Sequence, residues 1–523
     1  MYGIEHRSEA ALGQGFPKKK VAANGSTSTS ILDLRYLQAV RLRHFASLWY
    51  LFTIALRPRV TTGERRVEPW VGMKVDRTKL LTRRDFLGAM AGAAIWALTP
   101  AATVAALWRD DDAFLEDLSR CAFEFFWEHT DPDTGLTRGR ARTDGSPYDE
   151  TRRDIGSIAV TGFGLAGLCI AAERKWVKPG AARTRVRKTM QFFAEHAPRE
   201  HGWFYHWMNV KTGERAGFRQ NAEKKSELSS IDTALLMGGI LTARQYFHKD
   251  AEIARLASQI YARIDFQWML NGDPLVLCHG WKPEEGFLRG RWNRYSEHTI
   301  IYLLGIGSPR YAIKPKSWYA WERNQNSYAG FNFIGTAPLF THQYSQAFID
   351  YRHRRENGTS RVNWFENSVT ATRAHRQFCM DLATEFPGYS ANVWGITSSL
   401  SKTGYQAWGG PPRNKAIDGT VVPCAPAGSL MFTPDISLAA LRSMKERFGE
   451  KIYGRYGFTA AFHPTNGWVS PDVLGLDVGI TLLSAENLRT GNLWKWFMRN
   501  PEIPRAMKLA GLTRMSSRMN RSG

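Results

Sequence analysis

Two segments of the chain are apolar around most of a helical circumference, and they restrict the fold more than any other feature. DIGSIAVTGFGLAGLCIAA begins at Asp154, and SELSSIDTALLMGGIL begins at Ser226. A helix without a polar face is buried on all sides. Other segments, such as the one from Ala182 to Glu195 with its basic face, are apolar on one side only. The pattern therefore predicts enclosed helices that alternate with helices that cover them.

Acidic residues recur where the enclosed helices begin. Asp154, Glu227 and Glu297 follow one another at intervals of 73 and 70 residues. About 400 residues divided among six helical hairpins would give about 67 residues per hairpin, close to these intervals. The spacing predicts an all-α fold, an (α/α)6 toroid with two concentric rings of helices, whose acids lie at one rim of the inner ring. We expect helices at 113–129, 156–173, 182–196, 229–247, 251–265, 296–304, 364–385, 435–448 and 478–488, and aromatic loops between 266 and 345.

The net charge of +22 would suggest a nucleic acid or an anionic membrane as a partner, but it is concentrated at the ends of the chain. The first 90 residues hold sixteen Lys and Arg against seven Asp and Glu, and the last nineteen hold five basic residues and no acid. The middle has no zinc-ligand spacing, Arg-rich arm or RNP-type strand motif. We therefore expect no nucleic-acid partner.

An export signal is predicted near the amino terminus. Thr82–Leu87 reads TRRDFL, an apolar stretch follows from Gly88 to Leu98, and a run of small residues ends at Ala106. Paired arginines, a short apolar region and small residues near a cleavage point are typical of a twin-arginine signal. The alternative is a chance pair of arginines ahead of a buried helix. The signal predicts a periplasmic or secreted protein, with the Tat translocase as a partner during export.

The predicted domain boundaries follow from this signal. If translation begins at Met73, residues 73–106 are the signal peptide and 1–72 are a mis-assigned or disordered extension. No low-complexity linker divides the remainder, so 110–505 is expected to be one domain, followed by a basic tail over 506–523. The five cysteines are widely spaced and odd in number, which favours buried free thiols over disulfides or metal ligands.

Hydrolysis of a glycosidic bond needs one carboxylic acid that protonates the leaving oxygen and a second carboxylate that activates water or attacks the anomeric carbon. Glu227 precedes the expected cap, Ser229 or Ser230, so it lies just outside the helix and is the best candidate. Asp154 is a candidate too, with the role of a helix cap as an equal alternative. Asp232 is expected to be a first-turn residue rather than a catalyst.

Two further acids have stronger alternatives. Glu297 follows GRWNRYS, where it would bind a sugar hydroxyl or an arginine more readily than catalyse. Asp418 lies in AIDGTVVPCAPAGS, where Asp-Gly usually forms a turn. Side chains that could contact a sugar, although most of the rings are expected in the core, are His342, Tyr344, Trp203, Trp207, Trp281, Trp292, Trp318, Trp321, Trp394 and Trp408. No GxSxG elbow, phosphate loop, dinucleotide fingerprint or HExxH motif occurs, which argues against esterases, kinases, dehydrogenases and zinc proteases.

Seven collinear segments together resemble the glucoamylase-like domain of bacterial β-1,2-glucan-active proteins, including glycoside hydrolase family 144. They are DIGSIAVTGFGLAGL, SELSSIDTALL, YSEHTIIYLLGIGSP, FTHQYSQAFIDYR, NWFENSVTATRAHRQFC, IDGTVVPCAPAGSLMFTP and GLDVGITLLSAENLRTGNLW, and they extend over about 112–505. The resemblance implies an (α/α)6 toroid that hydrolyses β-1,2-glucan without a metal or an organic cofactor.

The resemblance also implies roles for individual residues. Glu227 matches the acid of the SELSSIDTALL segment, and Asp154 and Asp418 fall where the family has further acidic cleft residues. Glu297 matches a retained cleft glutamate, although His298 follows it where a small residue is expected. We therefore expect Glu227 to donate the proton and Asp154 or Asp418 to assist the attack of water, with inversion. For this role, the apolar surroundings of Glu227 would have to raise its pKa.

The mode of action has alternatives at this point. We expect an endo-acting hydrolase that works as a monomer on a glucan. An exo-acting enzyme, or a transglycosylase related to the domains of cyclic β-1,2-glucan synthases, is the alternative within the enzyme class. A non-catalytic periplasmic glycan-binding protein is the alternative from another class.

Overall fold

The computed structural model describes residues 101–148, 153–217, 225–357, 361–414 and 417–515, with side chains from residue 109 onward. All described residues belong to one compact unit. The predicted extension over 1–72 and the paired arginines of the export signal lie outside the described residues. Within those ranges, no helix is long and apolar enough to cross a membrane.

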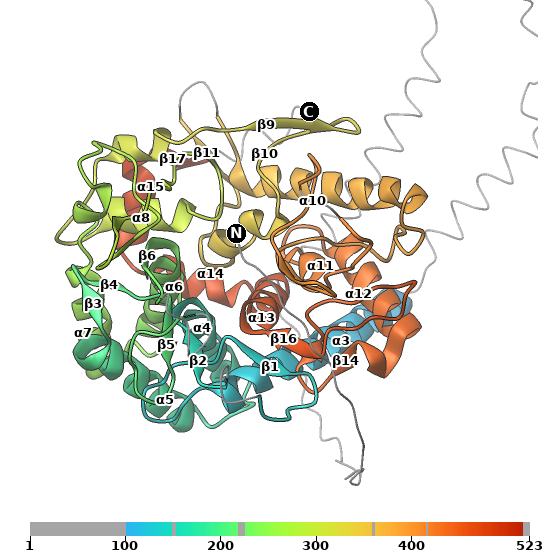
Figure 1. Cartoon of the computed structure of the whole chain (residues 1–523), viewed down its shortest axis with the longest axis horizontal. Helices are drawn as coiled ribbons and strands as arrows, with labels where there is room; N and C mark the ends of the chain where they lie inside the picture. The colour runs from blue at the N-terminus through green and yellow to red at the C-terminus, as the bar shows by residue number, and fades with distance from the viewer. Residues whose placement is uncertain (1–100, 149–152, 218–224, 358–360, 415–416, 516–523) are drawn as a thin grey trace, which may run out of the picture. The chain divides into compact units, whose positions relative to one another are not determined.

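The described fold is predominantly helical, as the sequence predicts, and buried helices alternate with partly exposed ones over most of the chain, except that two buried helices follow one another between Thr299 and Phe348. The buried helices are α4 (Ile158–Glu173), α6 (Ser230–Tyr246), α8 (Thr299–Gly307), α9 (Tyr344–Phe348), α11 (Cys424–Gly428) and α13 (Gly475–Arg489). The partly exposed helices are α3 (Ala101–His129), α5 (Pro179–Gln191), α7 (Ala251–Arg263), α10 (Trp364–Asp381), α12 (Pro434–Phe448), α14 (Asn492–Met498) and α15 (Glu502–Leu509). Helix α4 packs against both α6 and α13, and α5, α7, α10 and α12 lie around these three (Figure 1).

The closest approach of two buried helices depends on glycine. Gly162 in α4 faces Gly239 in α6. A Cβ atom on either residue would overlap backbone atoms of the opposite helix. These two positions need glycine because any side chain would push the helices apart.

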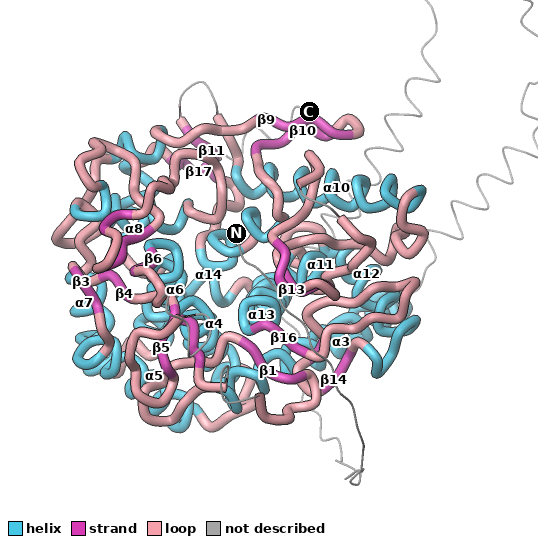
Figure 2. Tube along the Cα trace, in the orientation of Figure 1, coloured by secondary structure: helices cyan, strands magenta, loops and turns pink. Residues whose placement is uncertain are grey.

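Short strands precede several buried helices and fix where they begin (Figure 2). Strand β2 (Ile155–Ser157) leads into α4 and pairs with β5 (Trp207–Asn209). Strand β6 (Leu228–Ser229) leads into α6 and pairs with β7 (Gly280–Lys282), which pairs with β8 (Gly286–Phe287). Strand β16 (Asp472–Leu474) leads into α13 and pairs with β1 (Arg140–Arg142). The remaining strands are β3 (Arg199–Glu200), β4 (Trp203–Phe204), β9 (Gln325–Tyr328), β10 (Phe331–Ile334), β11 (Arg354–Glu356), β12 (Ser399–Ser401), β13 (Gly404–Gln406), β14 (Tyr453–Gly454), β15 (Gly457–Phe458) and β17 (Leu512–Arg514).

Four helices were not expected from the sequence: α9, α11, α14 and α15. Helices α9 and α11 have five residues each, too few for a helical period to show, and α11 contains Pro426 and Gly428. The predicted boundary at 505 is wrong because it falls inside α15, which buries Ile503, Ala506 and Met507. The chain then continues into β17, which pairs with β11, so 506–515 belongs to the fold rather than to a tail. The expected cleavage point at Ala106 lies inside α3.

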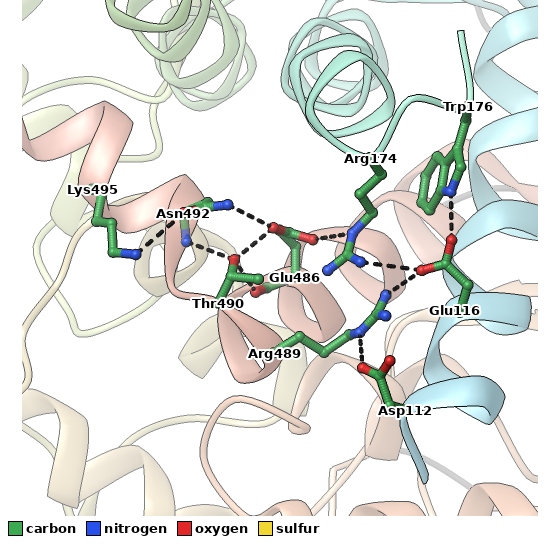
Figure 3. Close-up of polar contacts among 9 residues, drawn as sticks. All are labelled: Asp112, Glu116, Arg174, Trp176, Glu486, Arg489, Thr490, Asn492 and Lys495. Carbon is green, nitrogen blue, oxygen red and sulfur yellow. Dashed lines mark hydrogen bonds and ion pairs between the residues drawn. The ribbon is translucent and has the colours of Figure 1, made fainter. Parts of the chain in front are cut away.

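A network of charged side chains joins the carboxyl-terminal ends of α4 and α13 to α3 (Figure 3). Arg174, the carboxyl-terminal cap of α4, donates from Nε to Glu486 of α13 at 2.6 Å and from a guanidinium nitrogen to Glu116 of α3 at 3.1 Å. Arg489 donates to Glu116 at 2.7 Å and to Asp112 at 2.7 Å. Each carboxylate therefore has an arginine partner. We call this set the arginine network, and it includes Trp176, Thr490, Asn492 and Lys495 at its edge.

Candidate active site

Glu227 lies beside His206, just ahead of β6. The Oε1 atom of Glu227 is 3.0 Å from Nδ1 of His206, and the backbone N–H of His206 donates to the carbonyl of Glu227 at 2.9 Å. About a quarter of each side chain is exposed, 26% for Glu227 and 25% for His206. The ring of His206 stacks on Trp207 with centroids 4.4 Å apart. The predicted catalyst is therefore accessible and has an immobilised basic partner.

A second carboxylate, Asp232, contacts the other side of the same imidazole. Its Oδ1 atom is 3.5 Å from Nε2 of His206. Ser229 is the cap of α6: its Oγ accepts from the backbone N–H of Asp232 at 3.2 Å and donates to Oδ2 of Asp232 at 2.5 Å. Asp232 is a first-turn residue, as predicted, and it also places a carboxylate opposite Glu227. His206 thus lies between two acids, an arrangement that the sequence analysis did not predict.

The pKa values of Glu227, His206 and Asp232, which we call the trio, are shifted in different directions. Burial would raise the pKa of Glu227, but the hydrogen bond and charge of His206 outweigh it and lower that pKa to about 2. Burial would lower the pKa of His206, but the charge of Asp232 and the contact with Glu227 raise it. Burial raises the pKa of Asp232. The expectation that apolar surroundings raise the pKa of Glu227 is wrong for this site because the neighbouring imidazole dominates.

Glu297 lies near this trio at the start of α8. Burial raises the pKa of Glu297, and the charge of Asp232 adds to the effect, which places the two acids in one electrostatic environment. The Oγ atom of Ser296 donates to the carboxylate of Glu297. His298, where the resemblance implies a small residue, is fully buried and has the ring of Trp321 4.9 Å away. The departure from the family pattern therefore falls in the aromatic core.

Asp477 was not predicted from the sequence as a site residue. It lies in the first turn of α13 and accepts a hydrogen bond from Ser399 at 2.9 Å. Burial raises its pKa to about 7. Burial raises the pKa of Tyr344, and the charges of Asp477 and Glu297 add to this effect, so both acids act on the same phenol. An acid near the start of a buried helix was the available signal, although Asp154 and Glu227 precede their helices whereas Asp477 lies in the first turn.

Asp154 and Asp418 have local partners of their own. Asp154 pairs with Arg138 at 3.2 Å and Arg153 at 3.7 Å. Ser157 caps α4, so the capping role considered for Asp154 belongs to another residue. Asp418 accepts from the backbone N–H of Thr420 at 2.9 Å, which is the turn that Asp-Gly predicts. The contacts of these two aspartates among the described residues do not connect them to Glu227.

The aromatic candidates divide by exposure. Trp207 and Trp281 are partly exposed and flank Glu227, because Trp207 stacks on His206 and Trp281 pairs with Leu228. The other predicted sugar contacts are buried, namely Trp203, Trp292, Trp318, Trp321, Trp394, Trp408, His342 and Tyr344. Some of these buried side chains form hydrogen bonds within the protein: Trp203, for example, donates from its indole nitrogen to the backbone carbonyl of Asp265 at 2.9 Å. In the part of the chain that the structure describes, no group of three or more His, Cys, Asp or Glu side chains could hold a metal ion.

Comparison with known proteins places the chain in a family. A family described as "Putative glucoamylase" matches residues 290–501. A solved structure from Bacteroides fragilis with the same description is 30% identical, with a TM-score of 0.71 over 78% of this chain and 98% of that one. The endo-beta-1,2-glucanase from Chitinophaga pinensis, solved with sophorotriose and glucose, is 27% identical, with a TM-score of 0.71 over 77% of this chain and 98% of that one. The chain belongs to this glucoamylase-like family of glycoside hydrolases, as the sequence motifs predicted.

A curated relative is longer than this chain. The exo beta-1,2-glucooligosaccharide sophorohydrolase (non-reducing end) from Parabacteroides distasonis is 28% identical in an alignment of 435 positions that covers 76% of this chain. The match spans 58% of the length of that relative. The relatives are thus named for both endo and exo action on the same linkage.

Proposed function

We propose that the chain hydrolyses β-1,2-glucan at the site around Glu227. The observation that carries the proposal is the pair of carboxylates, Glu227 and Asp232, on the two sides of His206 where α6 begins, with Glu297 ahead of α8 within the electrostatic reach of Asp232. Glycosidic cleavage requires a carboxylic acid and a second carboxylate, and this group supplies the proposed acid. The names of the similar proteins supply the linkage.

The proposed architecture is an (α/α)6 toroid. The described ranges contain six buried helices, α4, α6, α8, α9, α11 and α13, and a covering helix separates each from the next except between α8 and α9. In this arrangement, the amino-terminal ends of the buried helices meet at one rim. Glu227, Glu297 and Asp477 come from the starts of three different buried helices, which supports the shared rim.

We assign the general acid to Glu227 and leave the base to Asp154 or Asp418. The proton of Glu227 passes to the glycosidic oxygen as the bond to the anomeric carbon breaks. A water molecule adds its oxygen to that carbon from the opposite face and gives a proton to the base, which inverts the configuration. Separate Asp154→Asn and Asp418→Asn variants distinguish the two bases: the variant that lacks the base loses turnover at all pH values.

The decisive experiment compares the cleavage of four glucans by the unchanged protein and by a variant that lacks the proposed acid, Glu227. Purified protein is incubated with linear β-1,2-glucan and, in parallel, with β-1,3, β-1,4 and α-1,4 glucans. We expect cleavage of the β-1,2 polymer alone, and no turnover by Glu227→Gln, which keeps its fold and its affinity for the glucan. Glu252→Gln on α7, an acid paired with Arg255 away from the site, is the matched control and stays active. An active Glu227→Gln variant, or cleavage of the α-1,4 polymer alone, would overturn the proposal.

The products separate the modes of action. Short oligosaccharides of several lengths indicate endo-hydrolysis, which we propose. Sophorose as the only product would instead assign exo action, the mode named for the Parabacteroides relative. Cyclic products would assign transglycosylation. A protein that binds the glucan and cleaves nothing would be a binding protein.

Export is a separate proposal and depends on the sequence alone. We propose that the TRRDFL segment directs the folded protein through the Tat translocase to the periplasm or beyond. Replacing Arg83 and Arg84 together with lysine is expected to retain the protein in the cytoplasm. Unchanged export of that variant would refute the signal.

A further inference from the structure

His206 contacts the proposed general acid, Glu227, directly, and its position suits a residue that influences the reaction by way of Glu227. Its two ring nitrogens face two carboxylates, Glu227 at 3.0 Å and Asp232 at 3.5 Å. The ring plane is fixed by stacking on Trp207, and its own backbone N–H bonds to Glu227. A protonated imidazole can donate to both acids at once, since both ring nitrogens then carry hydrogen.

We propose that His206 is a positioning residue that stores the proton which Glu227 delivers to the glycosidic oxygen. The inference rests on the proposed function, because it concerns how the general acid obtains its proton. In the empty site the pair is Glu227 carboxylate with His206 imidazolium. Together the two residues hold one proton across the neutral pH range, and they titrate as a unit rather than separately.

The charges around the imidazole come from three elements. Glu227, just ahead of β6, and Asp232, in the first turn of α6, contact the two ring nitrogens. Lys282 of β7 acts on Glu227 and lowers its pKa further. Glu297, ahead of α8, interacts with Asp232. Two acids in direct contact with one imidazole favour its charged form, so the pair keeps its proton above the ordinary pKa of histidine.

Substrate binding moves the proton along the existing hydrogen bond. A glucan that covers the exposed quarter of both side chains removes water from an ion pair, which favours its neutral form. The proton then passes from Nδ1 of His206 to Oε1 of Glu227, and from Glu227 to the leaving oxygen. Glu227 returns to the carboxylate, and the neutral imidazole takes a proton from solvent once the product leaves. No other reactant is needed.

Two variants test the storage role. Asp232→Asn keeps an acceptor for Ser229 but removes the charge that holds His206 protonated, so the alkaline limb of the kcat profile shifts about one pH unit toward acid. His206→Gln keeps an amide donor for Glu227 but cannot store a proton. We expect its kcat at pH 7 to fall about 100-fold, with KM changed less than about 3-fold and activity partly restored at low pH.

A second histidine provides the matched control. His201 also stacks on a tryptophan, Trp268, with centroids 4.3 Å apart, and faces one carboxylate, Asp265, at 3.8 Å. Its φ of 50° suits asparagine, so His201→Asn is the control variant. We expect the pH profile of this variant to match the unchanged protein. If His206→Gln and Asp232→Asn leave the profile in place while Glu227→Gln is inactive, the storage role is overturned and the proposed function stands.

A direct titration tests the inference even without turnover. In protein labelled with ¹³C-histidine, the signal absent from His206→Gln belongs to His206. In the unchanged protein, we expect the midpoint of its titration above pH 6.5. In Asp232→Asn, we expect that midpoint to be lower than in the unchanged protein. A His206 that is neutral at pH 6.5 in the unchanged protein would overturn the inference. Failure to cleave any glucan would overturn the proposed function instead, whatever the titration shows.

Discussion

The two ends of the buried helices carry charge in opposite ways. At the carboxyl-terminal ends of α4 and α13, the arginine network gives each acid a guanidinium partner, as the buried Glu486 has Arg174 at 2.6 Å (Figure 3). Where the buried helices begin, Glu227 and Asp232 share one imidazole, and the charge of Asp232 raises the pKa of Glu297. In the arginine network, the pairing of every acid with an arginine joins the helices. At the opposite end, acids outnumber their basic partner, and their carboxyl groups differ in pKa. The difference indicates that one end serves stability and the other serves chemistry.

The same chemical change at both ends should separate the two roles most strongly. Glu227→Gln is expected to lower kcat by about 1,000-fold or more, since general acid catalysis contributes about that much, while the protein stays folded. Product formation over time and chemical unfolding of the same preparation measure both effects. A large loss of stability with retained activity would reverse the assignment of this end.

Glu486→Gln is the counterpart in the arginine network. The acid is 1% exposed, and its loss leaves the guanidinium of Arg174 with a buried and incomplete set of partners. We expect the free energy of unfolding to fall by about 3 kcal/mol, measured by urea denaturation, while kcat stays within about 2-fold. A stability equal to that of the unchanged protein would show that the network is not a structural joint.

Asp477 makes the stability of the site end depend on pH. Its folded pKa of about 7 exceeds the value of an unfolded aspartate, so the unfolded state loses its proton first as pH rises. Stability should therefore decline between about pH 4 and pH 7. Asp477→Asn should flatten this decline and gain about 4 kcal/mol at pH 8, seen in unfolding curves at several pH values. A decline that persists in the variant would assign it to other groups.

The smallest effect concerns the helix caps. Ser229→Ala removes the cap of α6 and the hydrogen bond to Asp232, at a cost of about 1 kcal/mol. Ser157→Ala in α4 is the matched change away from the trio, and its bond to Val160 is longer, 3.4 Å, so it should cost less. Only Ser229→Ala should also alter the pH profile. Equal effects of the two variants on both properties would contradict a link between the α6 cap and the trio.

Much of the helical framework was predictable because hydrophobic period is a local property. The segments from Asp154 and Ser226 indicated α4 and α6 with their starts correct to within two residues. Helices α9 and α11 were missed because five residues cannot display that period, and tertiary burial alone stabilises them. The end of the domain was placed too early because the basic residues after Arg505 hide the apolar side of α15.

The sequence alone established the family motifs, the enclosed helices and the acids that precede them, because these depend on residue type and spacing. Tertiary structure decided the ionisation of those acids. His206 lies 21 positions before Glu227, and Ser399 lies 78 before Asp477, yet these partners determine which carboxyl is charged. Burial and neighbouring charge set a pKa, and both arise only when distant segments pack together.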